Sequence, residues 1–353
     1  MFVMKRILLG AAVLVLTALS GTASPGKTTP AGDPANLPPR AGDNPAAGAD
    51  TPALVVAPAI ARDTTLAVTL AAVGDVMLAR SVGQRVLADG ARTVFADTRE
   101  VLAGADITVA NLESAVGTRG EPAAKGYRFR APPATADALT DAGFDVVALA
   151  NNHTLDYGAE ALVETLALLD ARGVGHAGAG LDAATAHRAA VVVRNGLRVA
   201  FLSYVDVPSE GNFNRANWAA TEDRPGVVWF DEAAMRRDVE TARSRADIVL
   251  VFLHFGAEGS VVPTRKQRSQ AQSAIDAGAA LVLGSHPHVL QPVEEYNGGV
   301  IAYSLGNFVF DGFEGSANDT AIFIAELTRE GVQSWRMVTA SIGLDGLPRL
   351  TGE

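Results

Sequence analysis

The sequence predicts an α/β fold in which helices cover a largely parallel sheet. Short β-rich runs alternate with helical stretches along most of the chain, and this alternation is typical of parallel sheets with helical connections. With 353 residues, 48% of them hydrophobic, the chain can form a substantial core. We expect residues 66–353 to form the folded region, which is not too long for a single α/β domain.

The expected elements follow one another in a regular order. Apolar, β-rich runs predict strands at residues 66–73, 107–110, 146–150, 248–253 and 281–283. Amphipathic patterns predict helices at residues 159–172, 232–245 and 266–277.

Two antiparallel features interrupt this alternation. Residues 189–193 and 198–203 flank Asn195-Gly196, a dipeptide that favours a tight hairpin turn. Residues 321–327 and 334–340 predict further antiparallel strands near the C-terminus. No internal repeat is evident.

The N-terminal segment, residues 1–24, is organised like a secretory signal peptide. Lys5 and Arg6 precede an apolar run at residues 7–19, and small residues follow it. The run is shorter than the ~20 apolar residues of a membrane-spanning helix, so we expect cleavage, with an uncleaved anchor as the alternative. Residues 25–65, rich in Ala, Pro and Gly, predict a disordered linker. The folded region is therefore expected outside the cytoplasmic membrane, secreted or anchored to its outer face.

Composition excludes several classes of function. The chain has no cysteine, which rules out disulfides, thiolate catalysis and cysteine-bound zinc. The net charge is −10 and no dense basic run occurs, so nucleic acid is not an expected partner. Any metal must therefore be held by oxygen atoms and by imidazole nitrogens, to which the six histidines can contribute.

Five predicted strands each end in a compact polar motif. These motifs are AAVGD ending at Asp75, VANLE at Glu113, ALANNH at His153, VFLHFG around His254, and LVLGSHPH at His288. Ligands of open α/β sheets bind outside the carboxyl ends of strands, so these side chains can converge on one cavity. The mixture of oxygen and nitrogen donors favours one or two manganese, iron or zinc ions over calcium.

Each motif alone also has an ordinary structural explanation. Gly74-Asp75 suits a turn or a helix cap, and Asn111 and Glu113 could simply finish a strand. Asn151-Asn152-His153 could form a turn, and His254 could be a core histidine with one hydrogen bond. The set as a whole would need five coincidences of residue type and position, and it therefore favours a metal site.

The remaining histidines and a nearby carboxylate differ in what they indicate. His286-Pro287-His288 is the sharpest single motif, because proline stiffens a loop that carries two imidazoles. His176 and His187 lie outside the pattern and are expected in loops or on the surface. Glu258 follows His254 closely and is either a hydrogen-bond partner of a metal ligand or a surface carboxylate.

One short basic segment is ambiguous. Lys125, Arg128 and Arg130 alternate with Tyr127 and Phe129. The segment is either a solvated loop with one buried aromatic ring or an anion clamp for phosphate or carboxylate groups of a substrate.

The ordered motifs resemble the poly-γ-glutamate capsule biosynthesis family (CapA-type), a branch similar to calcineurin-like metallophosphoesterases. The resemblance covers roughly residues 66–309 and rests on VGDVML, NLES, ANNHTLDYG, HFGAE, GSHPHVLQP and SLGNFVFD. It implies a four-layer αββα sandwich, with two sheets between layers of helices, and a centre that binds two metals.

The resemblance also implies six metal ligands. It places Asp75 and His288 at the first metal, with Glu113 as the bridging carboxylate. At the second metal it places the remaining three, which are Asn152, His254 and His286.

Further implications concern catalysis and one departure. His153 matches the histidine that protonates a leaving group, and Asn307 occupies a family position that is either substrate-binding or structural. The wider metallophosphoesterase pattern begins Asp-x-His, whereas this chain has Asp75-Val76-Met77. The first metal is therefore expected to lack one imidazole and to bind weakly or not at all.

Taken as a whole, the resemblance implies an exported metal-dependent hydrolase or transferase-like protein of cell-surface polymer biosynthesis. Its substrate would be a phosphoester or the anionic polymer itself, and its partners would include membrane-bound polymer synthesis machinery. The alternative is a non-catalytic, metal-containing accessory protein that binds polyglutamate for export or anchoring.

Overall fold

The computed structural model describes residues 66–351. The signal segment and linker predicted for residues 1–65 lie outside the described residues. Within residues 66–351, no helix combines the length and the hydrophobicity needed to cross a membrane.

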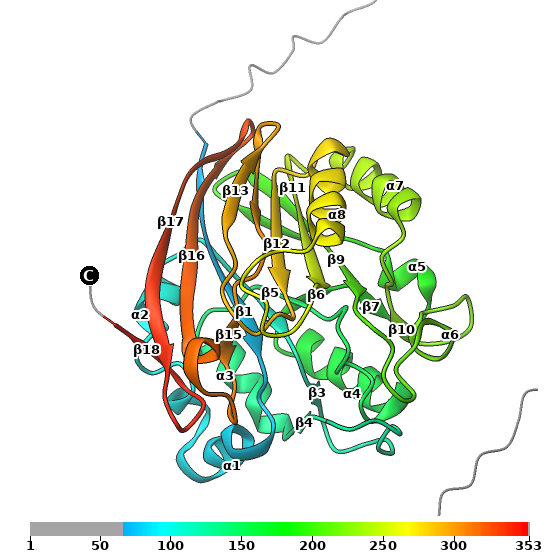
Figure 1. The fold of residues 1–353 in the computed structure, drawn as a ribbon, viewed down its shortest axis with the longest axis vertical. Coiled ribbons are helices and arrows are strands. Elements are labelled where there is room, and N and C mark those ends of the chain that lie inside the picture. The colour runs from blue at the N-terminus through cyan, green and yellow to red at the C-terminus, as the bar shows by residue number, and fades with distance from the viewer. Residues whose placement is uncertain (1–65, 352–353) are drawn as a thin grey trace, which may run out of the picture. The chain divides into compact units, whose positions relative to one another are not determined.

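Two β-sheets form the centre of the described chain (Figure 1). The first has the strand order β18-β17-β16-β1-β2-β5-β6, with β15 beside β1. Its members are β1 Val68–Val76, β2 Ile107–Leu112, β5 Val146–Ala148, β6 Gly175–Ala177, β15 Asn307–Val309, β16 Asp319–Thr328, β17 Gly331–Ile342 and β18 Pro348–Leu350. Strands β16 to β18 are antiparallel additions to a parallel core of β15, β1, β2, β5 and β6.

The second sheet has the order β13-β14-β12-β11-β9-β8. Its members are β8 Ala190–Arg194, β9 Leu197–Asp206, β11 Ile248–Phe255, β12 Leu281–Ser285, β13 Val293–Tyr296 and β14 Gly299–Ala302. The four middle strands are parallel, and the two edge strands, β8 and β13, are antiparallel to their neighbours. Two short ladders pair β3 Ala115–Val116 with β4 Arg130–Ala131, and β7 Ala179–Gly180 with β10 Gly226–Val227.

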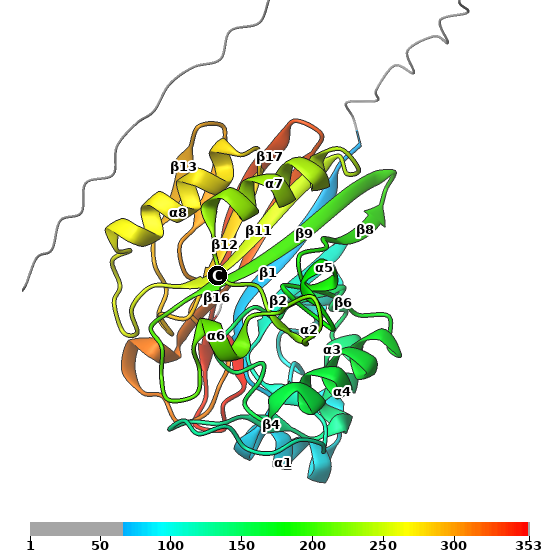
Figure 2. The ribbon, with the colours of Figure 1, turned by 90° about the vertical axis from the view of Figure 1, so that its right-hand side faces the viewer.

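Helices cover the outer faces of both sheets. The α-helices are α1 Arg80–Asp89, α2 Arg99–Ala103, α3 Ala136–Asp141, α4 Gly158–Asp170, α5 Ala183–Ala186, α6 Arg215–Trp218, α7 Glu232–Arg243 and α8 Arg265–Asp276. Short 3₁₀ turns occur at Ala91–Thr93, Pro133–Thr135 and Gly315–Asn318. Figure 2 shows α7 and α8 along the second sheet.

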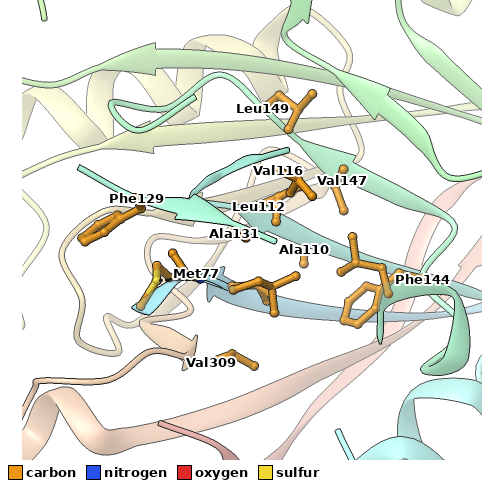
Figure 3. Packing of buried hydrophobic residues seen from close by; sticks show 14 of the residues in the cluster. Met77, Ala110, Leu112, Val116, Phe129, Ala131, Phe144, Val147, Leu149 and Val309 are labelled. Carbon is orange, nitrogen blue, oxygen red and sulfur yellow. Dashed lines mark hydrogen bonds between the residues drawn. The ribbon is translucent and has the colours of Figure 1, made fainter. Parts of the chain in front are cut away.

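The alternation of side chains along the strands produces three cores. On β1, Leu70 and Ala72 point into the core between the sheets, whereas Ala71 and Val73 point into the core beneath α1 to α4. Strand β11 alternates in the same way between the inter-sheet core and a third core beneath α7 and α8. Figure 3 shows the core beneath α1 to α4, where Phe144 packs near Val147. The period of two is what a sheet buried on both faces requires.

The predicted elements are confirmed, and the four-layer arrangement expected from the resemblance is observed. The five predicted strands are β1, β2, β5, β11 and β12, and the three predicted helices are α4, α7 and α8. The Asn195-Gly196 turn joins β8 to β9, and the C-terminal pair is β16 and β17. The expectation of one largely parallel sheet needs correction, because the predicted strands are divided between two sheets.

The expectation that two histidines lie in loops or on the surface is confirmed for His187 and wrong for His176. His176 lies on edge strand β6, is half-buried, and has Nε2 3.2 Å from Oδ1 of Asp170. His187 is half-buried in the turn that follows α5, with Nδ1 2.6 Å from Oδ2 of Asp238. Each histidine pairs with a carboxylate on a helix.

Candidate metal centre

Asp75 is turned toward the space between the sheets by a bulge in β1. The β1–β2 register shifts just before Asp75, where β1 contains one residue more than β2, and Asp75 then pairs with Asn111. A bulge of this kind redirects the next side chain to the other face of the sheet. Gly74 is needed at this point, because a Cβ there would lie 1.9 Å from the carbonyl oxygen of Gly306.

Buried amides connect the ends of β1, β2 and β5. Nδ2 of Asn111 donates to Oδ1 of Asp75 at 2.8 Å, and Nδ2 of Asn151 donates to Oδ1 of Asn111 at 3.1 Å. Oδ1 of Asn151 in turn accepts from the backbone N–H of His153 at 3.0 Å. The three strand ends, and the polar motifs that follow them, are therefore held in fixed positions.

Glu113 is the clearest indication of a cation. Its side chain is fully buried one residue beyond the end of β2, and neither carboxylate oxygen has a hydrogen-bond partner. Oε1 lies 3.7 Å from Nε2 of His254 and 3.8 Å from Nε2 of His153. Burying a carboxylate without a partner costs several kcal/mol, on the order of the desolvation penalty for a single ion. A bound divalent cation would remove this cost, so these residues fit a metal.

Three further candidate ligands of this cluster are histidines. His254 lies near the end of β11, with Nε2 2.8 Å from Oδ1 of Asn152 and Nδ1 2.9 Å from Oγ of Ser285. His286 and His288 follow β12 and have φ values of 95° and 58°. Left-handed backbone is costly for non-glycine residues and occurs mainly at functional sites. This geometry gives ring centroids 4.9 Å apart for His254 and His286, and 5.9 Å apart for His286 and His288.

The candidate ligands form two overlapping groups. In one, ligand atoms of Asp75, Glu113 and His288 all lie within 4.8 Å of one another. In the other, ligand atoms of Glu258, His286 and His288 do so. Through the contacts of His254 with Glu113 and Asn152, all six predicted metal ligands belong to one cluster.

The charges of this cluster suit metal binding. Burial raises the pKa of Glu113, and the Asp75 carboxylate raises it further. Burial opposes ionisation of Asp75, but the hydrogen bond and charge of His288 prevail and hold its pKa well below the ordinary value. Burial lowers the pKa of His254, and it lowers that of His286 to about 3. These two imidazoles are therefore neutral at physiological pH, with lone pairs available to a metal.

His288 behaves differently from the other two histidines. Burial lowers the pKa of His288, but the hydrogen bond and charge of Asp75 outweigh burial and raise it. Nδ1 of His288 lies 3.4 Å from Oδ2 of Asp75 and 2.8 Å from Oδ1 of Asn307. Asn307 is fully buried and also donates to the carbonyl of His288 at 3.3 Å, so its contacts are those of a residue that positions His288.

His153 faces Glu113 through Nε2 and is held from behind. Its Nδ1 lies 2.6 Å from Oδ2 of Asp156, whose Oδ1 lies 2.9 Å from Nζ of Lys125. The ring of Phe129 stacks on the imidazole at 4.2 Å between centroids. Burial lowers the pKa of His153, while the hydrogen bond to Asp156 opposes this shift. The pairing fixes Nδ1–H toward Asp156 and leaves Nε2 free to exchange a proton at the cluster.

The Lys125–Asp156 pair is a part of the site that sequence reasoning missed. Both side chains are 0% exposed, and Nζ of Lys125 also donates to the backbone carbonyl of Asn152. Nζ lies 5.7 Å from the ring centroid of Phe213, which adds a cation–π contact. The motif ANNHTLDYG places Asp156 three residues after His153, and this spacing was a sequence signal for the acidic member of the pair.

We expect Lys125→Met to lower the free energy of unfolding of the metal-free protein by about 3–5 kcal/mol, because it leaves Asp156 buried without its cation. Lys266→Met is the matched control, since Lys266 pairs with Asp206 at 2.6 Å but is 68% exposed. Loss of an exposed pair should cost about 1 kcal/mol or less. Urea unfolding measures both values, and equal losses in the two variants would contradict the buried role of Lys125.

The two arginines of the predicted anion clamp donate to backbone carbonyls outside the cluster of candidate ligands. Arg128 is exposed, and its Nη1 donates to the carbonyl of Ala123 at 3.2 Å. Nη1 of Arg130 donates to the carbonyl of Thr118 at 3.3 Å, and its Cζ lies 4.1 Å from the ring centroid of Tyr157. Their role in substrate binding stays a prediction. Glu258, by contrast, is exposed directly beside His286 and His288.

The sequence matches a known protein family over the region that carries this cluster. The profile of the family described as bacterial capsule synthesis protein PGA_cap matches residues 69–312, which include all six candidate ligands. This chain belongs to the PGA_cap family. The resemblance inferred from the motifs is thereby confirmed.

Curated relatives agree with this membership. The chain is 33% identical to the PGA biosynthesis protein CapA of Bacillus subtilis over 76% of this chain and 70% of the relative. It is 32% identical to the capsule biosynthesis protein CapA of Bacillus anthracis over 80% of this chain and 69% of the relative. A probable polyglutamine synthesis accessory protein of Mycobacterium tuberculosis is 35% identical over 60% of this chain and 57% of the relative.

Solved structures align with this chain at low sequence identity. A hypothetical protein from Thermus thermophilus aligns with a TM-score of 0.50 and 17% identity, over 77% of this chain and 98% of its own. The calcineurin-like phosphoesterase YfkN from Bacillus subtilis aligns with a TM-score of 0.43 and 13% identity, over 81% of this chain and 91% of its own.

Proposed function

We propose that this PGA_cap protein is a metal-dependent hydrolase of poly-γ-glutamate capsule biosynthesis. Its substrate would be a phosphoester or the anionic polymer itself. One observation carries the proposal: the buried Glu113 carboxylate lacks any hydrogen-bond partner and is flanked by His254 and by the oriented His153. A binding module has no evident need for an imidazole held in this way by a buried carboxylate.

We propose one or two divalent manganese, iron or zinc ions as the cofactor, because the donor set mixes carboxylate oxygens with imidazole nitrogens. Asp75, Glu113 and His288 would hold one ion, and the second would be held by Asn152, His254 and His286. When bound, such an ion lowers the pKa of water from ~15.7 toward roughly 7 and so makes a nucleophile accessible at neutral pH.

The protein's own residues would supply the remaining chemistry. Nε2 of His153 would protonate the leaving oxygen or nitrogen, and Asp156 would stabilise the imidazolium form at 2.6 Å. Lys125 holds the Asp156 carboxylate in place, and Phe129 fixes the plane of the imidazole ring. Protonation of a leaving group of this kind contributes about a hundred- to ten-thousand-fold in rate.

The biological setting is proposed from the relatives' names. Those names refer to PGA and capsule biosynthesis, so the partners proposed here are the polymer and membrane-bound synthesis machinery. One relative is named a probable accessory protein, which favours a second candidate function. In that candidate, the same cluster of residues binds polyglutamate for export or anchoring without turnover.

Turnover by the purified chain distinguishes the two functions. The metal-free protein would be loaded with Mn²⁺ and assayed on nitrophenyl phosphate, bis-nitrophenyl phosphate and poly-γ-glutamate. Release of nitrophenol or shortening of the polymer supports the hydrolase. A fully metal-loaded protein that binds the polymer but hydrolyses nothing would refute it in favour of the accessory protein.

We predict that the domain from residue 66 onward lies outside the cytoplasmic membrane, because a basic start and a short apolar run precede it. An alkaline phosphatase fused after residue 63 should be active in intact cells, and deletion of residues 1–24 should abolish that activity. Activity of a fusion partner that works only in the cytoplasm would show that this location is wrong. Cell fractionation would distinguish the cleaved protein from the anchored one.

A further inference from the structure

His288 belongs to both groups of candidate ligands found in residues 66–351. Asp75, Glu113 and His288 already supply three protein ligands, the number that suits a catalytic ion with an open position for water. Met77, two residues after Asp75, adds no donor, because it is fully buried and its Sδ accepts from the backbone N–H of Ala79 at 3.2 Å. Figure 3 shows Met77 within the apolar core.

Glu258 belongs to the second group of candidate ligands, with His286 and His288. A carboxylate oxygen of Glu258 and ligand nitrogens of His286 and His288 lie within 4.8 Å of one another. The carboxylate is exposed, whereas every other member of the cluster is buried. It is therefore the donor that can reach an ion from the solvent side.

The loop that carries Glu258 is built to face the cluster. Gly256 and Gly259 on either side have φ values of 106° and 71°, which favour glycine and turn the chain back on itself. The N–H of Gly259 donates to the carbonyl of Pro287 at 2.8 Å, which ties this loop to the one that carries His286 and His288. Nδ1 of His286 is buried without a hydrogen-bond partner.

We propose that Glu258 is a metal ligand that acts together with His286 and His288. This assignment rests on the metal centre of the proposed function. The group then has one carboxylate and two imidazoles, a mixed set of oxygen and nitrogen donors that suits Mn²⁺, Fe²⁺ or Zn²⁺. Because Glu258 is on an exposed loop, its ion would be the more exchangeable of the two.

The test is direct Mn²⁺ binding, measured by calorimetry and by electron paramagnetic resonance on the full chain. The wild-type protein should bind two equivalents with a spin-coupled signal. In Glu258→Gln, one equivalent should bind as before, the other should weaken by at least about tenfold, and the coupled signal should disappear. Glu258→Asp, which keeps the carboxylate, should lie between the two.

Glu314→Gln is the matched control. Glu314 is also exposed and follows Phe313, whose ring lies 4.8 Å from that of His288, but it belongs to neither candidate metal group. This variant should bind both equivalents of Mn²⁺ as the wild type does. It therefore controls for the loss of one negative charge near the centre. Circular dichroism checks that each variant is folded, as the exposure of both residues leads us to expect.

The other outcomes separate this assignment from the proposed function. If Glu258→Gln binds both ions as Glu314→Gln does, Glu258 is not a ligand, while the hydrolase proposal is unaffected. If the wild-type protein binds no Mn²⁺, the metal centre and the role of Glu258 both fall. If metal binding responds as expected but the wild-type protein hydrolyses nothing, Glu258 remains a ligand and the hydrolase proposal is wrong.

Discussion

Replacing His254 or His286 by alanine should remove most of the transition metal from protein purified without chelator. Both imidazoles are buried, with pKa values that burial lowers, to about 3 for His286. Metal binding therefore displaces no proton from them near neutral pH, and their full affinity is lost on substitution. Since loss of a residue that merely supports a ligand weakens metal binding by about 10- to 100-fold, loss of a ligand should exceed that.

Metal analysis by plasma mass spectrometry measures this effect, with His187→Ala as the matched control. His187 is another histidine held by a carboxylate, with Nδ1 2.6 Å from Asp238, but it lies in the turn that follows α5, outside the cluster. It should retain the wild-type one to two equivalents. Full retention of metal in both His254→Ala and His286→Ala would show that the metal centre is wrongly assigned.

The parts of the fold that could be predicted are those that leave a local pattern in the sequence. Strands β1 and β11 read as apolar runs and were predicted because burial on both faces leaves that local signature. Their division between two sheets depends on pairings between distant residues, such as Leu250 with Leu281 and with Phe201. Both strands would look the same in one sheet, and only the family resemblance pointed to two.

The candidate ligands of the site were predictable because each lies at or shortly beyond the carboxyl end of a strand. Their orientation was not. The bulge that turns Asp75 inward depends on contact between Gly74 and Gly306, more than two hundred residues later in the chain. The positive φ values of His286 and His288 likewise have no local signal, because non-glycine residues rarely adopt them without tertiary support.

Lys125 illustrates a different limit. It lies in a basic segment in which Arg128 is exposed, so the sequence alone could not separate a solvated lysine from a buried one. The distinction arises because Asp156, Asn152 and the aromatic ring of Phe213 meet around its amine only in the fold. The burial of a charge is decided by its partners, which the local sequence does not reveal.

His153→Ala should lower kcat by about a hundred- to ten-thousand-fold while leaving metal content nearly unchanged. Nε2 of His153 lies 3.8 Å from Glu113, yet Nδ1 is occupied by Asp156 at 2.6 Å, an arrangement that suits proton transfer. Asn152 is the neighbouring residue that contacts His254 within the cluster, at 2.8 Å, so the ligands remain when His153 is removed. KM should change little, because protonation of the leaving group is a transition-state interaction.

The dependence on leaving group separates an acid from a merely structural histidine. The leaving groups of phenyl and alkyl esters are basic oxyanions that need a proton, so hydrolysis of these esters by His153→Ala should fall most. Nitrophenyl esters should be hydrolysed by this variant almost as fast as by the wild type. Asp156→Asn should reproduce this pattern more weakly, since it frees the ring without removing it, and His176→Ala should have no effect. An equal loss for all esters would indicate a collapsed site instead. If His153→Ala empties the metal centre, His153 is a ligand, and if every rate is intact, no general acid acts at this position.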